Sequence, residues 1–450
     1  MIYSSILSDY AQTLGGVIRK AGKEAAEVSF SEGYRSSLPA FDSAQVENVR
    51  NCLLPVAVLG NTTDFVSNRL GNTVNLVSAT GKKDGSDGLD FQESSLKSRF
   101  ILLDTAKKLL PQERITFCMH SLPNKATGAT VEQDIETGHS FIAGVARCGL
   151  GWTCPVCATK IAMGRREEID NALKMAEEQG LQPYFVTYTA SHTRDDALEA
   201  NLADMKKAIR WVRMGGTWQK IKSDYGIVGY IDSWEITWGF SNGWHAHMHE
   251  VIFAKVGVDV KDLEKTIFER WDKSLSRLGL FASEEHGVKV VLADNDISAY
   301  LTKWSLKTEM TGSSFKDAKK NSYTPMGLLS LAEAGEKWAG TLYQEYARAT
   351  KGKSAIRWSR GLRDLLELGN ASSDQELADA EQGRKSRTLA VFPGDLWKEI
   401  QKAGRKGIIG ELLVVAGMGK ESLDVWLGAV FDLEIDIEGQ VKRRREKIPL

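Results

Sequence analysis

The sequence of 450 residues contains no run of about 18 consecutive apolar residues, the length that a membrane-spanning helix requires. Residues 1–16 also lack the basic and continuous apolar segments of a secretion signal, because polar side chains interrupt them. These absences predict a cytoplasmic protein without a membrane partner.

Cysteine is scarce, with five residues in the chain, and three of these lie within residues 148–157. Secreted disulfide frameworks usually contain an even number of spaced cysteines. The odd number and the crowding therefore argue against such a framework.

A strong excess of either charge is also missing, since the formal net charge is −1. With 42% hydrophobic and 26% charged residues, the composition is ordinary for a soluble globular protein, and the length allows about two or three domains. A charge near zero gives no sign of a nucleic-acid partner, although phosphate contacts require only a local basic patch.

The crowded cysteines precede a strongly amphipathic segment, residues 158–180. Thiolates three positions apart, as in the C-P-V-C of this sequence, can hold one tetrahedral metal ion. The alternative is a set of buried free thiols. We predict a structural Zn²⁺ site held by Cys118, Cys148, Cys154 and Cys157. For the fourth position, His120 is a rival of Cys118.

Histidine is equally scarce, but three of the seven residues alternate, at His245, His247 and His249. Alternate side chains of a strand share one face. Residues 230–238 also read as a strand, and a hairpin centred on the intervening turn places Glu235 opposite His247. Imidazoles and a carboxylate suit a divalent metal with open coordination positions. The alternative is a strand whose histidines only form hydrogen bonds.

The order of elements around this hairpin predicts an α+β fold with a ferredoxin-like or RRM-like antiparallel sheet. Its first and third strands are central, and its helices cover one face and leave the other for substrate. The predicted elements are a strand at 183–190, a helix at 198–212, the hairpin, a helix at 263–275 and a strand at 288–292.

A second group of reactive side chains follows the last strand. If residues 294–304 form a helix, Asp296, Tyr300 and Lys303 share one face. A tyrosine hydroxyl is a weak nucleophile because its pKa is about 10. Covalent catalysis therefore requires a metal-polarised phosphate, a nearby cation, or both. A tyrosine at such a position is otherwise more often a core aromatic.

Several of these motifs resemble those of the HUH endonucleases, specifically the rolling-circle plasmid replication initiators with a single catalytic tyrosine. GWHAHMHEVIF resembles their metal motif, and Tyr-Leu-Thr-Lys resembles their Tyr-x-x-Lys motif. Residues 185–189, followed by His192, resemble their first motif, and C-P-V-C resembles an element that often precedes it. The likeness spans about residues 114–369.

The resemblance implies roles for individual residues. His247 and His249 become the metal pair for Mg²⁺ or Mn²⁺ together with Glu235, and His245 lies beside them. Tyr300 becomes the nucleophile, assisted by Lys303, and Asp296 activates water for the terminating cleavage, although the family branch concerned has the longer Glu there.

The same resemblance implies an enzyme that nicks and rejoins single-stranded or cruciform origin DNA and works with a host helicase and DNA polymerase. The alternatives are a conjugative relaxase or transposase of the same superfamily, or a non-catalytic zinc-containing DNA-binding regulator.

Residues 303–363 contain 12 Lys or Arg against 5 Asp or Glu, a local charge of +7. Basic side chains beside an aromatic suit a surface that follows a phosphate backbone, whereas the alternative is a solvated basic helix face. The predicted DNA-binding residues are His192, Lys307, Arg357, Trp358, Arg360 and Arg363.

Four regions follow from these patterns. Residues 1–95 have no predicted role, residues 96–180 hold the zinc element and its helix, and residues 181–330 form the HUH endonuclease domain. Residues 331–450 form a helical, partly basic C-terminal region, which includes the basic run 442–447.

Overall fold

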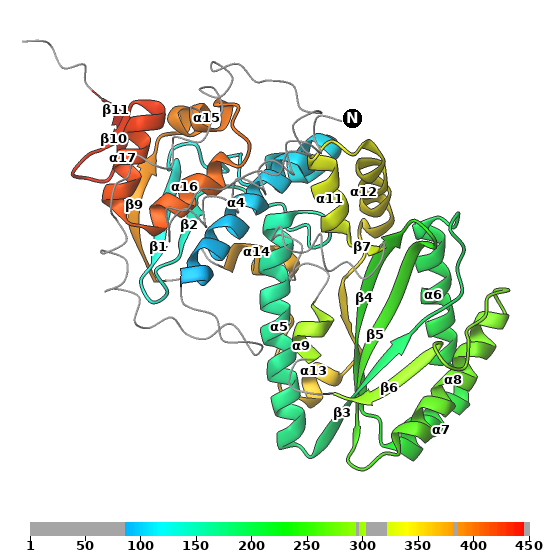
Figure 1. The fold of residues 1–450 in the computed structure, drawn as a ribbon. Coiled ribbons are helices and arrows are strands. Elements are labelled where there is room, and N and C mark those ends of the chain that lie inside the picture. Colours follow the sequence, from blue (N-terminus) through cyan, green and yellow to red (C-terminus); the bar gives the residue numbers. More distant parts are fainter. Residues whose placement is uncertain (1–85, 294–296, 303–321, 381–384, 445–450) are drawn as a thin grey trace, which may run out of the picture. The chain divides into compact units, whose positions relative to one another are not determined.

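The computed structural model describes residues 86–293, 297–302, 322–380 and 385–444, with only the backbone of residues 86–95, 299 and 300. The predicted α+β class with antiparallel sheets is confirmed (Figure 1). Within the described ranges, no helix has the length and apolar character needed to cross a membrane.

The main sheet contains six strands and carries the histidine hairpin. Its strands are β3 (Leu181–Tyr188), β4 (Gly229–Gly239), β5 (Gly243–Lys255), β6 (Val288–Leu292), β7 (Ser322–Tyr323) and β8 (Ile356–Trp358). The order is β6-β3-β5-β4-β7, with β8 also paired to β4, and all of these pairs are antiparallel. The histidine strand β5 is therefore central, as the element order predicts.

Two helices cover one face of this sheet. They are α6 (Leu198–Val212) and α8 (Val260–Ser276), which pack against each other, and α8 also packs against β6. The apolar stripe predicted for residues 198–212 is buried. Another helix, α7 (Gly215–Tyr225), follows α6 and was not predicted, although Trp218 and Ile221 form its buried face.

On the other side, α5 (Pro155–Glu178) contacts β3 and the short helix α9 (Ile297–Leu301). Figure 1 shows α9 between α5 and the main sheet. The helix that follows the cysteine motif and the helix that contains Tyr300 are therefore neighbours.

A second sheet joins segments that are far apart in sequence. Its order is β2-β1-β9, formed by β1 (Ala129–Asp134), β2 (Ser140–Ala143) and β9 (Ser386–Phe392). A hairpin of β10 (Leu433–Ile435) and β11 (Val441–Arg443) follows. The C-terminal region is thus helical only in part, because its strand β9 pairs with β1.

The remaining helices connect and cover these sheets. They are α4 (Ser86–Leu109), the 3-10 turn η3 (Arg114–Phe117), α11 (Pro325–Glu333), α12 (Lys337–Thr350), α13 (Leu362–Leu365), α14 (Asp374–Asp379), α15 (Gly394–Lys402), α16 (Ile408–Gly417) and α17 (Lys420–Phe431).

A buried charge network ties α6 to the two strands of the hairpin. Arg213 Nη2 lies 2.6 Å from Asp232 Oδ1 and 2.7 Å from Glu250 Oε1. The hydroxyl of Tyr188 donates to Glu250 at 2.7 Å. Burial alone would lower the pKa of Arg213, but Glu250 and Asp232 raise it well above its usual value. The arginine therefore stays charged and neutralises two cross-strand carboxylates.

Replacement of Arg213 by Met should destabilise the protein by about 3–5 kcal/mol, because the buried Glu250 would lose its cation and Asp232 would keep only Arg357. Urea unfolding followed by tryptophan fluorescence measures the loss. The exposed Arg210 on the same helix is the matched control, and Arg210→Met should change the stability by less than about 0.5 kcal/mol. Equal midpoints for the two variants would refute the structural role of the network.

Candidate functional site

The hairpin has the register that the sequence predicts, with Glu235 opposite His247. The turn between the strands ends at Gly243, whose φ is +69°. A Cβ at this position would lie 2.3 Å from the carbonyl oxygen of Arg194, so only glycine fits. This tight end of the turn fixes the pairing of every later residue in β5.

Thr187 in β3 and Thr189 just after it orient the imidazoles that the sequence assigns to a metal. Thr187 Oγ1 lies 3.1 Å from His249 Nδ1, and Thr189 Oγ1 lies 3.0 Å from His247 Nδ1. Each ring therefore uses Nδ1 for a threonine, so Nε2 is its nitrogen for other partners, and in His249 that partner is Glu235. Hydrogen bonds of this kind typically fix the ring orientation of metal-binding histidines.

Glu235 contacts the histidine diagonal to it. Its Oε2 lies 2.8 Å from Nε2 of His249, although its register partner is His247. Side chains on one face of a sheet reach diagonal as well as direct neighbours. The His249 side chain is buried, whereas the carboxylate is about a third exposed, at 32%. The pair therefore lies where an ion or a phosphate has access.

Burial keeps His247 and His245 neutral. Burial, followed by the charges that His245 and His249 would carry, lowers the pKa of His247 to about 3. Burial and His192 also lower the pKa of His245. Near neutral pH both rings are therefore unprotonated, which is the form that binds a metal ion.

The row of imidazoles extends past the hairpin to the loop after β3. Nε2 of His192 lies 3.2 Å from Nδ1 of His245, and the centroids of the His245 and His247 rings are 4.0 Å apart. The structure thus brings His192, which the sequence assigns to DNA binding, into the same row as the metal candidates.

Ser233 holds α9 against the histidine face of the sheet. Its Oγ donates a hydrogen bond of 2.6 Å to the carbonyl of Leu301 in α9. Ser233 is the register partner of His249 and lies two residues before Glu235, so these side chains share one face. The helix whose sequence includes Tyr300 is therefore attached beside Glu235 and His249.

Four predicted residues have no described side chain. Tyr300 belongs to α9, but its side chain lies outside the described residues, and so do Asp296, Lys303 and Lys307. Their catalytic and DNA-binding roles stay predictions.

The structure brings the four cysteines assigned to zinc together. The sulfur atoms of Cys118, Cys148, Cys154 and Cys157 all lie within 4.8 Å of one another, and all four residues are buried. The rival ligand His120 is exposed and is not in this group. In the part of the chain that the structure describes, no other group of three or more potential ligands is as tight, and the histidine–glutamate group is more open.

The sulfur positions suit a tetrahedral ion. Cys118 lies 3.6 Å from Cys154 and 3.5 Å from Cys157, and Cys148 lies 3.7 Å from Cys157. These distances far exceed a disulfide bond of about 2.05 Å. They are close to the edge of about 3.8 Å of a tetrahedron with Zn–S bonds of about 2.3 Å.

Local structure places these thiols and sets their ionisation. Cys154 caps α5, since its sulfur accepts a hydrogen bond from the backbone N–H of Cys157, and Pro155 begins the helix. Hydrogen bonds from Cys118 and the other thiols hold the pKa of Cys157 well below its usual range. Burial raises the pKa of Cys154. The cluster thus offers one thiolate readily, and a cation would allow the others to ionise.

Two of the predicted DNA-binding arginines make polar contacts within the protein. Arg357 donates to Asp232 at 3.0 Å, and its side chain stays half-exposed, at 51%. Arg363 lies over the ring of Trp358, 4.7 Å from its centroid, and donates to three backbone carbonyls. Arg360 is exposed. Arg360 and Arg357 are therefore the more accessible of these cations.

The sequence analysis placed Thr187 and Thr189 in a motif but gave them no role at the site, and it did not identify Ser233. The signal was present, because β3 and β4 flank the histidine strand and these residues alternate in step with it. Only the strand order and register, however, show which face they share with the histidines.

Comparison with known proteins gives a consistent result. Residues 141–264, from β2 to the start of α8, match a family described as "Replication protein". The chain is 27% identical over 356 residues to "Protein rep" of Streptomyces lividans, a match that covers 62% of this chain and 77% of that protein. The resemblance to replication initiators is confirmed.

Shorter matches concern two further proteins. The chain is 29% identical over 104 residues to "Protein rep" of Lentilactobacillus hilgardii, covering 23% of this chain and 32% of that one. It is 30% identical over 139 residues to "Neomycin resistance protein" of Streptomyces cyanogenus, covering 26% and 32% respectively. No solved structure matches the chain.

Purified protein should retain about one equivalent of zinc, and Cys154→Ser should lose most of it and melt at a lower temperature, because ligation and folding are coupled in such sites. Elemental analysis and thermal melting measure both effects. Cys52, which lies outside the described residues and is not a predicted ligand, provides the control Cys52→Ser. Full zinc retention in Cys154→Ser would disprove the site.

Proposed function

We propose that the protein, whose residues 141–264 match the replication-protein family, is a metal-dependent DNA nicking and joining enzyme of the HUH type. It initiates rolling-circle replication of a plasmid by cutting one strand of single-stranded or cruciform origin DNA. A host helicase and a DNA polymerase then act on the nicked template.

The observation that supports this proposal most directly is the shared face of Glu235, His247 and His249 beside α9. The residues fit a divalent ion such as Mg²⁺ or Mn²⁺, because two oriented imidazoles and a partly exposed carboxylate leave coordination positions open. An ion held there would draw charge from a phosphate oxygen. The hydrogen bond between Glu235 and His249 would open to admit it.

The chain's own residues account for the remaining chemistry. In the proposed cleavage, the hydroxyl oxygen of Tyr300 forms a bond to the phosphorus, the bond from phosphorus to the 3′-oxygen breaks, and a proton passes to that oxygen. The products are a 5′-phosphotyrosyl link and a 3′-hydroxyl that a polymerase can extend. The covalent link preserves the bond energy, so rejoining requires no nucleotide triphosphate. Lys303 would favour the ionised tyrosine.

His247→Ala and His249→Ala should each slow nicking by at least roughly a hundredfold, because metal stabilisation of the transition state is worth several kcal/mol. DNA affinity should change little, since phosphate contacts elsewhere supply most of it. Cleavage of an origin oligonucleotide in Mg²⁺ or Mn²⁺, with binding measured in parallel, tests both statements.

His245→Ala is the matched control for these variants and should be milder, because His245 contacts His192 rather than Glu235. A loss for His245→Ala as large as for the other two would show that the metal pair is assigned wrongly. A wild-type protein that binds origin DNA and never cuts it would instead be a zinc-containing regulator.

Tyr300→Phe removes only the hydroxyl, so it should abolish the covalent protein–DNA adduct without a large change in DNA affinity. Asp296→Ala should still form the adduct but release it slowly, because the terminating step requires a base that deprotonates water. Denaturing gels of protein-linked oligonucleotide measure both. An adduct in Tyr300→Phe would show that another tyrosine is the nucleophile. Undiminished release in Asp296→Ala would show that Asp296 has no role in termination.

A further inference from the structure

A cavity of about 160 Å³ lies on the face of the main sheet opposite the histidines. Its floor is formed by Trp234 and Ile236 of β4 and Met248 of β5, which alternate with Glu235 and the histidines. Its walls are α6 and the segment 350–357 between α12 and β8. The cavity and the histidine site therefore share the strands β4 and β5 but open on different sides.

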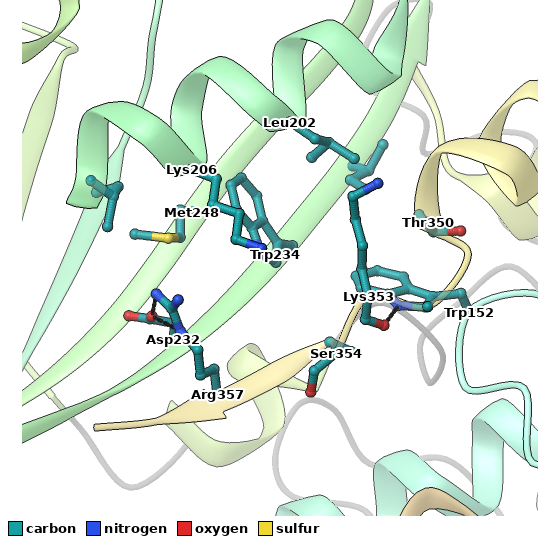
Figure 2. A pocket seen from close by; sticks show the side chains of 14 residues that line it. Trp152, Leu202, Lys206, Asp232, Trp234, Met248, Thr350, Lys353, Ser354 and Arg357 are labelled. Atoms are coloured by element: carbon teal, nitrogen blue, oxygen red, sulfur yellow. Dashed lines mark hydrogen bonds and ion pairs between the residues drawn. The ribbon is translucent and has the colours of Figure 1, made fainter. Parts of the chain in front are cut away.

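Three cations and two indoles line this cavity. Figure 2 shows the side chains of Lys206, Lys353 and Arg357 around the indole of Trp234, with Trp152 at one end. The one carboxylate in the lining is Asp232, which is already paired with Arg213. The lining is therefore positively charged around a flat apolar surface.

The three cations differ in whether they have a partner within the protein. Arg357 is paired with Asp232, and the ammonium group of Lys353 donates to the carbonyl of Ala349. Lys206 is exposed on α6, and no described residue forms an ion pair or a hydrogen bond with its ammonium group. A ligand with negative charge would supply the partner that Lys206 lacks.

The edge of β4 beside the cavity is open in the described part of the chain. β8 pairs with Ile231–Ser233 and β7 pairs with Trp238–Gly239, so no described strand pairs with residues 234–237 on that edge. These residues include both Glu235 of the histidine site and Trp234 of the cavity. The two sites are thus adjacent across one strand edge.

We propose that this cavity binds one nucleotide, with the base stacked on Trp234 and the phosphate held by Lys206 together with Arg357. Stacking on an indole and phosphate contact by lysine and arginine are the two features that nucleotide sites for single strands combine. A purely apolar ligand would leave Lys206 without an anionic partner, and an inorganic anion would leave Trp234 uncovered.

A nucleotide of this kind has two sources, a DNA strand or a free nucleotide. The inference that it comes from a strand rests on the proposed nicking function, because a strand that crosses the histidine face would pass the open edge of β4. The nucleotide site itself depends only on the cavity.

The test is calorimetric titration of the full-length protein with dTMP and, separately, with an oligodeoxythymidylate. Lys206→Glu should weaken binding of either probe at least about tenfold, because the charge that faces the phosphate is reversed. Lys207→Glu is the matched control, since Lys207 lies on the same helix over Trp211 and does not line the cavity. It should leave the binding constant within about twofold.

Trp234→Leu provides a second variant, in which loss of stacking should weaken dTMP binding while circular dichroism and zinc content show that the protein is folded. Equal loss in Lys206→Glu and Lys207→Glu, or no binding of either probe by the wild type, would overturn the proposal. An effect on dTMP alone would identify a free nucleotide as the ligand, and an effect on the oligonucleotide would identify the strand. Neither result depends on nicking, so a protein that does not cut DNA would refute the proposed function and leave this site intact.

Discussion

The pairing register of β4 and β5 is the constraint on which the rest of the site depends. A slip of one residue would turn every side chain of β5 to the opposite face. His247 and His249 would then lie on the face that α6 covers, and Trp244 and Met248 would lie on the face that carries Glu235. The steric demand at Gly243 and the Arg213 network, which grips Asp232 and Glu250 across the two strands, both oppose such a slip.

The cysteine cluster is connected to the histidine site through the helices α5 and α9. It fixes the start of α5, since Cys154 is the cap of that helix. The helix then contacts β3 and α9, and Ser233 holds α9 from the opposite side. The helix that contains Tyr300 therefore lies between α5, which the cysteine cluster anchors, and the strand that carries Glu235. A structural ion would in this way contribute to catalytic geometry without contacting the substrate.

Local patterns predicted the parts of the fold in which the partner is close in sequence. The alternation of His245, His247 and His249 and the nearby glycine turn contain enough information to set a hairpin register. The strand β9 was missed because it pairs with β1, some 250 positions earlier. A local hydrophobic pattern does not indicate a pairing partner that is so distant in sequence. Likewise, Arg357 and Arg363 lie in a basic segment that is typical of DNA contacts. Only the tertiary structure shows that both side chains have partners within the protein.

Alternate side chains of β4 point to opposite faces of the sheet, so one strand contributes to two different sites. Glu235 faces the histidines, whereas its neighbours Trp234 and Ile236 line the cavity on the other side. A ligand stacked on Trp234 would press on the backbone that positions Glu235, because adjacent residues of a strand share that backbone. Occupancy of the cavity and the geometry of the metal site would then be coupled energetically, and by linkage each would influence the other equally. In a nicking enzyme, such coupling would make cleavage sensitive to a nucleotide beyond the cut phosphate, without any contact between that nucleotide and the reacting atoms.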